Sequence, residues 1–212
     1  MARRKHSFAN ENFYHIFNRG VEKRRIFSND KDHERFLRGL KHYSQERRKL
    51  SRRTSQKGDD STWNPVEIVG YCLMPNHFHL LIKQASEDGV SLFMNHLANS
   101  YTKYFNTRYK RVGPLFQGAF KSVPIESEEQ LLHLSRYIHL NPVVAGLSRS
   151  PEDYKWSSYS TYIDNDNDPS EDFINPNIVL GQFVNKEEYS QFVEDQSDYA
   201  KQLEELKHLS LD

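Results

Sequence analysis

The stretch MPNHFHLLI at residues 74–82 constrains the fold of this chain more than any other segment. It continues a hydrophobic run at residues 66–74, and the Pro-Asn pair between the two apolar segments is typical of a tight turn. The two segments therefore predict a β-hairpin. Side chains alternate between the two faces of a strand, so His77 and His79 should share one face while their apolar neighbours enter a core on the other.

Two imidazoles that project from one strand face provide half of a metal site. The alternative is that His77 and His79 only form hydrogen bonds at a strand edge, because two ligands alone do not fix an ion. The single cysteine, Cys72, excludes an internal disulfide and any cysteine-based zinc cluster. It lies in the apolar run of the hairpin, where we expect it to be a small core residue.

The composition predicts one substantial core with room for a tail, since the chain has 212 residues and is 36% hydrophobic. No apolar run approaches the roughly 18 residues of a membrane span, and the basic start at residues 1–6 lacks the apolar segment of a signal peptide. We therefore expect a soluble, cytoplasmic protein that has no membrane partner.

The formal charge of zero conceals a strong asymmetry along the sequence. Residues 1–125 contain 23 Lys and Arg against 11 Asp and Glu, whereas residues 126–212 contain 6 against 18. A basic, aromatic-rich segment predicts a polyanionic partner, most simply nucleic acid, because Lys and Arg displace counterions from phosphates and aromatic rings stack on unpaired bases. The alternative is that the two halves neutralise each other within the fold.

Hydrophobic spacing and breaker residues predict an alternation of strands and helices around the hairpin. In chain order the other elements are a strand at 13–17, a helix from Asp30, a polar loop at 47–61, a helix at 91–108, a Gly-Pro break at 113–118, a strand at 120–125 and a helix from Ser127. Ser127 is a suitable N-cap for the last of these, and Pro142 predicts that the helix ends near Asn141.

This last helix carries the second group of candidate residues. Its apolar positions at 131, 134 and 138 form one stripe, and Tyr137 and Asn141 lie together on a neighbouring polar stripe, one helical turn apart. The spacing would allow one helix to offer both a nucleophile and an oxygen ligand. A lone tyrosine on a helix is more often structural, and three rivals occur in the preceding helix region: Tyr101, Tyr104 and Tyr109.

With these motifs in order, the chain resembles the single-tyrosine HUH transposases, an IS200-like family, and within it the branch of REP-associated tyrosine transposases. The resemblance covers residues 10–162 and is specific, because the His-hydrophobic-His element, the tyrosine and their order occur together. The segments that carry it are 13–20, 70–82, 113–118, 137–142 and 154–159.

The resemblance implies an α+β fold, a ferredoxin-like (RRM-like) sandwich in which helices pack on one face of a central antiparallel sheet. Beyond the span of the resemblance, the sequence itself indicates a helical C-terminal appendix. Residues 1–162 would be the catalytic domain, and residues 163–212 an acidic linker followed by a helix at 187–209. This final helix is interpreted as a packing element, with a regulatory or partner-binding role as the alternative.

The resemblance also implies cleavage of single-stranded DNA by a tyrosine, giving a 5′-phosphotyrosine link and a free 3′-hydroxyl. On this reading Tyr137 is the nucleophile, His77 and His79 bind Mg²⁺ or Mn²⁺, and Asn141 is a third metal ligand. The expected partner is single-stranded DNA with hairpin structure, and the protein would act as a monomer or a homodimer. No Gly-rich phosphate loop is present, and transesterification requires none.

Basic residues distributed over several segments are the candidate DNA contacts: Arg19, Arg47, Arg48, Lys49, Arg52, Arg53, Lys103, Arg108, Lys110, Arg111 and Lys121. The chain departs from the family at Ala119 and Val144, where an arginine is usual, and this leaves an inactive or repurposed copy as an alternative. The alternatives in function are a non-catalytic nucleic-acid-binding module on the same fold, and a structural metal protein. The second conflicts with the four protein ligands that structural zinc usually requires.

Overall fold

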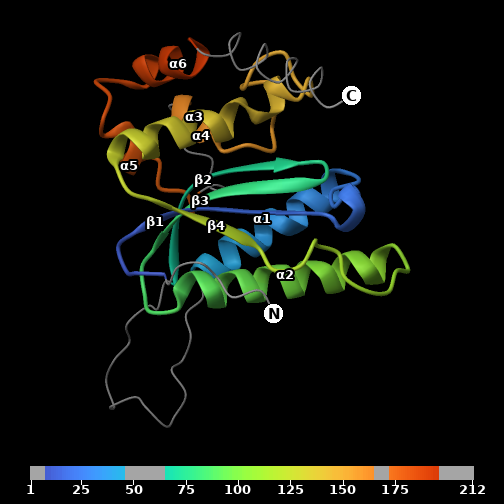
Figure 1. The fold of residues 1–212 in the computed structure, drawn as a ribbon. Helices are drawn as coiled ribbons and strands as arrows, with labels where there is room; N and C mark the ends of the chain where they lie inside the picture. Colours follow the sequence, from blue (N-terminus) through green and yellow to red (C-terminus); the bar gives the residue numbers. More distant parts are fainter. Residues whose placement is uncertain (1–7, 46–64, 165–171, 196–212) are drawn as a thin grey trace, which may run out of the picture.

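A four-stranded antiparallel sheet forms the centre of the computed structural model, which describes residues 8–45, 65–164 and 172–195 (Figure 1). The strands lie in the order β2-β3-β1-β4. Their bounds are Phe13–Arg19 for β1, Val66–Met74 for β2, His77–Gln84 for β3 and Lys121–Ile125 for β4. The predicted hairpin is β2 and β3, joined by the two-residue turn. The loop predicted at residues 47–61 lies outside the described residues.

Helices cover both faces of this sheet (Figure 1). On one face lie α1 (Asp30–Ser44) and α2 (Gly89–Arg108), and on the other lie α3 (Glu128–Val144), α4 (Tyr159–Ile163), α5 (Asn177–Leu180) and α6 (Lys186–Glu194). The α+β fold class and the helical C-terminal part are thus confirmed, but the expectation of helices on one face only is wrong. The cause is visible in β2, where residues on both faces are apolar and buried, so each face needs a covering layer.

Each face of the sheet has its own hydrophobic core. Phe78, Leu80 and Ile82 of β3 enter the core beneath α1 and α2, as the alternation predicted. Cys72 is fully buried in the opposite core, and burial raises the pKa of its thiol, so it behaves as the small core residue that the sequence indicated. The two histidines of β3 therefore lie on the face that α3 covers.

The N-terminus of α3 lies where the sequence predicted it, and the C-terminus does not. Ser127 is the N-cap, and its Oγ accepts a hydrogen bond from the backbone N–H of Gln130 at 3.2 Å. The helix extends past Asn141 to Val144, which corrects the predicted end, and Pro142 lies within its last turn. Proline has no backbone N–H, so one intrahelical hydrogen bond is lost there. The helix tolerates this loss because it ends two residues later, at Val144.

Glycines permit the chain to turn between α2 and β4. Gly113 and Gly118 have φ angles of 92° and 86°, in the left-handed region that other residues adopt at a cost. The turn between this helix and the strand therefore requires a backbone conformation that favours glycine at these two positions.

Among the described residues, no helix combines the length and apolar character that a membrane span needs.

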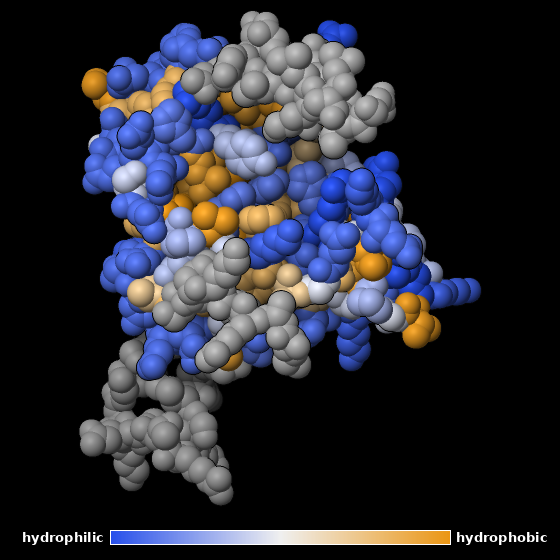
Figure 2. Space-filling view, in the orientation of Figure 1, coloured by the Kyte–Doolittle hydropathy of each residue, from blue (hydrophilic) through white to orange (hydrophobic). Residues whose placement is uncertain are grey.

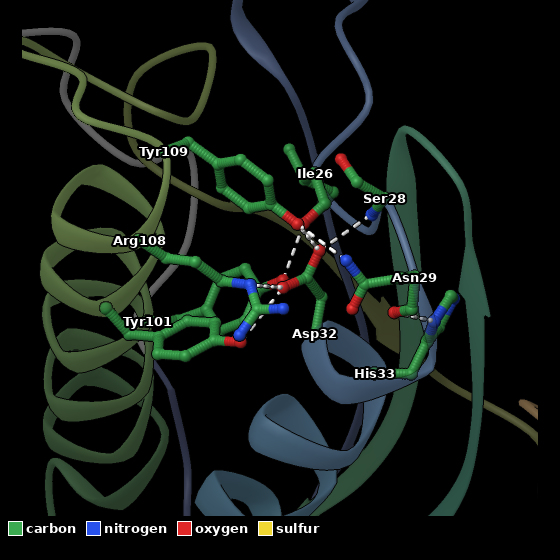
Figure 3. A network of polar contacts seen from close by, with 9 residues as sticks. Ile26, Ser28, Asn29, Asp32, His33, Tyr101, Arg108 and Tyr109 are labelled. Carbon is green, nitrogen blue, oxygen red and sulfur yellow. Dashed lines mark hydrogen bonds and ion pairs between the residues drawn. The ribbon is translucent and has the colours of Figure 1, made fainter.

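A buried carboxylate joins the start of α1 to the end of α2 (Figure 3). Asp32 is fully buried, and its oxygens accept hydrogen bonds from the backbone N–H of Ser28 at 2.9 Å and from the hydroxyls of Tyr104 at 3.0 Å and Tyr109 at 2.7 Å. The guanidinium of Arg108 lies 3.6 Å from the same carboxylate. These contacts compensate the cost of burying a charge, so Asp32 fixes the packing of the two helices.

A buried histidine joins the C-terminal segment to α3. The two ring nitrogens of His139 lie 2.7 Å from the hydroxyl of Tyr189 in α6 and 2.9 Å from the hydroxyl of Ser158, beside α4. Tyr189 also donates to Ser135 in α3 at 3.2 Å. Here α6 acts as a packing element, while the rest of the predicted helix and residues 165–171 of the predicted linker lie outside the described residues.

The Asp32 contacts generate a stability prediction. Replacing Asp32 by Ala should lower the free energy of unfolding by about 3 kcal/mol, because three donors lose a charged acceptor in a buried place. Asp30→Ala is the matched control, since Asp30 forms an exposed ion pair with Lys155, and should cost less than about 1 kcal/mol. Urea unfolding followed by circular dichroism measures both. Equal losses would contradict the structural role of Asp32.

His139 generates a prediction on the pH dependence of stability. Burial lowers the pKa of His139 to about 3, whereas an unfolded histidine titrates near a pKa of about 6.5. Between these values the unfolded chain binds the proton and the folded chain does not, so stability falls as the pH falls. From about pH 7 to about pH 4.5 the loss should reach about 2–3 kcal/mol. His139→Gln should show a drop that is smaller by this amount, and an unchanged drop would refute the assignment.

Candidate active site

The register between β1 and β3 assembles the site on the α3 face of the sheet. Phe17 pairs with His79 and Arg19 pairs with His77 in this antiparallel ladder. Directly paired residues point to the same face, so alternate residues of β1, including His15, lie on the face that carries the two histidines of β3. The prediction that His77 and His79 share a face is thereby confirmed.

Tyr137 projects from α3 onto this group of histidines. Its ring centroid lies 5.5 Å from that of His79 and 6.1 Å from that of His15, in edge-to-face arrangements. The side chain is nevertheless 50% exposed. The helix is positioned by its apolar stripe, in which Leu131 and Ile138 are buried against the sheet. The Tyr137 ring is therefore packed against two imidazoles while half of the residue remains exposed.

The histidines of the site are neutral near pH 7. Burial lowers the pKa of His15 and of His77 to about 4, and the positive charge of Arg19 contributes to the shift at His77. Burial also places the pKa of His79 well below its usual value, with smaller effects from the other two imidazoles. A neutral imidazole is the form that binds a metal ion, so the environment suits ligation.

Each histidine of the hairpin has a hydrogen-bond partner for its Nδ1 atom. Nδ1 of His77 lies 2.6 Å from Oδ1 of Asn76, and Nδ1 of His79 lies 2.9 Å from Nε2 of His15. These partners leave the Nε2 atoms of both histidines for a ligand. Sequence reasoning missed His15 and Asn76. His15 alternates with the buried residues of a predicted strand, but its contact with His79 follows only from the pairing of that strand with β3.

Asn141 lies one turn beyond Tyr137, and its side chain contacts the helix backbone. The amide nitrogen donates to the backbone carbonyl of Tyr137 at 2.7 Å, which leaves Oδ1 as the atom with ligating capacity. In the described parts of the chain, no three His, Cys, Asp or Glu side chains are grouped to hold a metal ion. A cation at His77 and His79 would therefore need a different third ligand, such as an amide oxygen or water.

The three rival tyrosines lie under the opposite face of the sheet and serve the α1–α2 contact. The Tyr101 hydroxyl donates to the backbone carbonyl of Ile26 at 2.5 Å, and Tyr104 and Tyr109 donate to Asp32. Burial raises the pKa of Tyr101 and of Tyr104, with Asp32 adding to both shifts. The structure gives these hydroxyls structural partners and leaves Tyr137 beside the histidines.

The structure separates the candidate DNA contacts into groups. Arg19 and Lys121 are exposed on the strands that border the site, and Nζ of Lys121 lies 6.0 Å from the ring centre of Phe17. Lys103 and Arg108 belong to α2 on the other layer, where Arg108 approaches Asp32. Lys110 and Arg111 lie just after α2, and the remaining candidates lie outside the described residues: Arg47, Arg48, Lys49, Arg52 and Arg53.

Apolar surface is also exposed near the site. Figure 2 shows orange side chains across the middle of the molecule, at the level of β4 and between the two helical layers. Val123 of β4 is 49% exposed and pairs with His15 across the sheet. Together with half-buried Phe17, it provides a flat apolar surface beside the histidines and Tyr137. Such a surface suits the flat faces of unpaired bases.

Two known proteins show what the chain is similar to. The chain is 26% identical over 105 residues to a protein of Haemophilus influenzae described as a REP-associated tyrosine transposase, an alignment that covers 45% of this chain and 60% of the relative. The chain therefore spans about three fifths of that relative's length. A solved structure of a REP-associated tyrosine transposase bound to a REP hairpin superposes with a TM-score of 0.56 at 15% identity, covering 83% of this chain and 93% of that one. This second likeness shows a shared fold.

A family model gives the assignment. The model described as transposase IS200-like matches residues 10–141, a span that contains β1, the hairpin with both histidines, and α3 through Tyr137 and Asn141. This span is more than half of the chain, and it includes every residue of the geometry described above. The chain therefore belongs to the IS200-like transposase family.

Proposed function

We propose that this protein is a metal-dependent endonuclease and strand-transferase of single-stranded DNA, in which Tyr137 forms a transient 5′-phosphotyrosine link. The observation that carries the proposal is the position of the half-exposed Tyr137 ring against two neutral imidazoles, those of His79 and His15. Membership of a transposase family supports DNA processing. The geometry supports Tyr137 as the residue that carries it out.

The chemical step exchanges one phosphodiester bond for another. Oη of Tyr137 attacks the phosphorus, the Oη–P bond forms and the bond from phosphorus to the 3′-oxygen breaks. The phenolic proton leaves Tyr137, and the departing 3′-oxygen gains a proton to become a hydroxyl. Attack by a 3′-hydroxyl on the phosphotyrosine reverses the step and rejoins DNA. The energy of the broken bond is retained, so no nucleotide cofactor is needed.

The donor atoms fit a divalent cation. The Nε2 atoms of His77 and His79, with Oδ1 of Asn141 or water, would hold Mg²⁺ or Mn²⁺, which when bound stabilises negative charge on the non-bridging oxygens of the phosphate. Imidazole favours Mn²⁺, whereas abundance favours Mg²⁺. The residues of the chain then have separate tasks: the histidines align the phosphate and Tyr137 attacks it.

The surroundings of the site suit a single-stranded substrate. Arg19 and Lys121 supply positive charge for the backbone, and the apolar surface of Phe17 and Val123 can accept unpaired bases. The structural relative was solved with a REP hairpin. We propose that DNA carrying a palindromic hairpin with single-stranded flanks is the substrate here as well, and that its processing serves DNA transposition.

Replacing Tyr137 by Phe should abolish the covalent adduct with labelled single-stranded hairpin DNA in Mn²⁺, because the ring and its packing remain while the attacking oxygen is lost. DNA binding should stay within about threefold of the wild-type level, because the phosphate contacts are unchanged. Denaturing gels detect the adduct, and peptide mapping should place the nucleotide on Tyr137.

Tyr109→Phe is the matched control, since it removes a hydroxyl that Asp32 uses and should keep the adduct. An adduct that persists in Tyr137→Phe would show that the nucleophile is another residue. Wild-type protein that binds the hairpin without forming any adduct would favour the alternative function, a non-catalytic nucleic-acid-binding module.

Replacing either His77 or His79 by Ala should reduce adduct formation by at least about 100-fold, because the phosphate loses the cation that stabilises its developing charge. The variants should remain folded, which circular dichroism checks, since neither histidine is a member of the two core clusters, although His79 is buried. A variant with both histidines replaced that cleaves at the wild-type rate would refute the metal site.

A further inference from the structure

We infer that Asn76 and His15 are positioning residues that fix the tautomers of His77 and His79, so that both histidines carry a proton on Nδ1 and present Nε2 to one cation. The inference rests on the proposed function for the identity of the ligand and goes beyond it in assigning two residues. Its evidence is the set of contacts on the far side of each imidazole.

The orientation of the Asn76 amide decides the tautomer of His77. Nδ2 of Asn76 donates to the backbone carbonyl of Lys23 at 3.3 Å, so Oδ1 is the atom that faces Nδ1 of His77 at 2.6 Å. An amide oxygen can only accept, and the hydrogen on this bond must therefore be on Nδ1. The reverse orientation of the amide would set its oxygen against the carbonyl of Lys23. In a neutral imidazole the lone pair is then on Nε2.

Backbone contacts hold Asn76 in this position. The Pro75 carbonyl accepts hydrogen bonds from the backbone N–H groups of Ile26 and Phe27 at 2.8 and 3.0 Å, and the Asn76 carbonyl accepts one from Gly20 at 2.9 Å. The hairpin turn is thus fixed to the segment that follows β1. The amide of Asn76 is presented to His77 by the fold and not by a mobile loop.

His15 has the corresponding position at His79. Its Nε2 lies 2.9 Å from Nδ1 of His79, and the two rings are stacked with centroids 5.1 Å apart. One hydrogen is shared on this bond. If His15 accepts it, Nε2 of His79 has a free lone pair, whereas the reverse arrangement places a hydrogen on the Nε2 atom that a cation would need. We assign His15 as the acceptor, so that His77 and His79 both carry the hydrogen on Nδ1.

The assignment explains why the site contains a third histidine that is not a ligand. His15 is half-buried beside Tyr137, and its Nε2 atom is already used by His79. In metal sites a partner on the second ring nitrogen orients the ligand and raises its basicity, and loss of that partner weakens metal affinity by about 10–100-fold. His15 and Asn76 would provide this support for the two ligands.

The first test is independent of activity. Long-range ¹H–¹⁵N NMR of the labelled wild-type chain at neutral pH, without metal, reports which nitrogen of each histidine carries hydrogen. Both His77 and His79 should show the Nδ1–H tautomer. The Nε2–H tautomer at either residue would overturn the inference for that residue, whether or not the protein cleaves DNA.

The second test measures Mn²⁺ binding by electron paramagnetic resonance in matched variants. Asn76→Leu and His15→Phe remove the acceptor and should weaken Mn²⁺ affinity by about 10–100-fold. Asn76→Asp keeps an acceptor oxygen, and His15→Gln replaces the acceptor nitrogen by an amide oxygen. Both variants should bind Mn²⁺ within about threefold of the wild type or more tightly. His42→Gln, on α1 and remote from the site, should leave the affinity unchanged.

Equal Mn²⁺ affinity in Asn76→Leu, His15→Phe and the wild type would overturn the supporting role. Failure of the proposed function has a different signature. Wild-type protein that shows both predicted tautomers and forms no covalent adduct with hairpin DNA would refute the transesterase and support the tautomer assignment. The loss of affinity on removing the acceptors, recovered in Asn76→Asp and His15→Gln, would support both residues as positioning residues.

Discussion

The antiparallel pairing of β1 with β3 is the interaction on which the candidate site depends. It sets Phe17 opposite His79 and places His15 within hydrogen-bond distance of the same imidazole. A register shift of one residue would turn His15 and Phe17 to the opposite face of the sheet, because side chains alternate with a period of two. The apolar residues on the α1–α2 face prevent this shift, since it would expose Tyr14 and Ile16 and bury charged Arg19. Core packing therefore fixes the geometry of the chemistry.

The second layer of helices places the tyrosine over that sheet. The buried positions of α3 fix its rotation, and Tyr137 follows from the helical spacing once Leu131 and Ile138 are packed. His139, two residues further along, connects the helix to α6 through Tyr189. The C-terminal segment thus contacts the helix that carries the proposed nucleophile on the side away from Tyr137, because two residues turn a helix by about 200°. A helix with this support can present an exposed side chain without losing its position.

The sequence predicted most of the fold from local patterns and missed what depends on pairing between distant segments. Alternation in residues 74–82 predicted the shared face of His77 and His79, and helical spacing predicted the buried and polar stripes of α3. The pairing of β1 with β3 joins residues more than sixty positions apart, so the contact of His15 with His79 had no local signal. The same reason explains the unpredicted partners of Asp32. Helices were expected on one face because the resemblance implied that arrangement, whereas the apolar residues on both faces of β2 require a covering layer on each face.

The fold gives Tyr137 surroundings that differ from those of the three rival tyrosines, and this difference supports its proposed role as the nucleophile. Of these four tyrosines, Tyr101, Tyr104 and Tyr109 donate their hydroxyl hydrogens to Asp32 or to the carbonyl of Ile26 in structural bonds. Tyr137 combines a packed ring with a side chain that is half exposed. A nucleophile needs this combination, because packing limits the orientations of the oxygen while exposure admits the phosphate. Exposed Arg19 lies on β1 with His15, and exposed Lys121 lies on the neighbouring strand β4. Part of the basic charge of the first half of the chain therefore lies beside the imidazoles, where the proposed DNA substrate would need it.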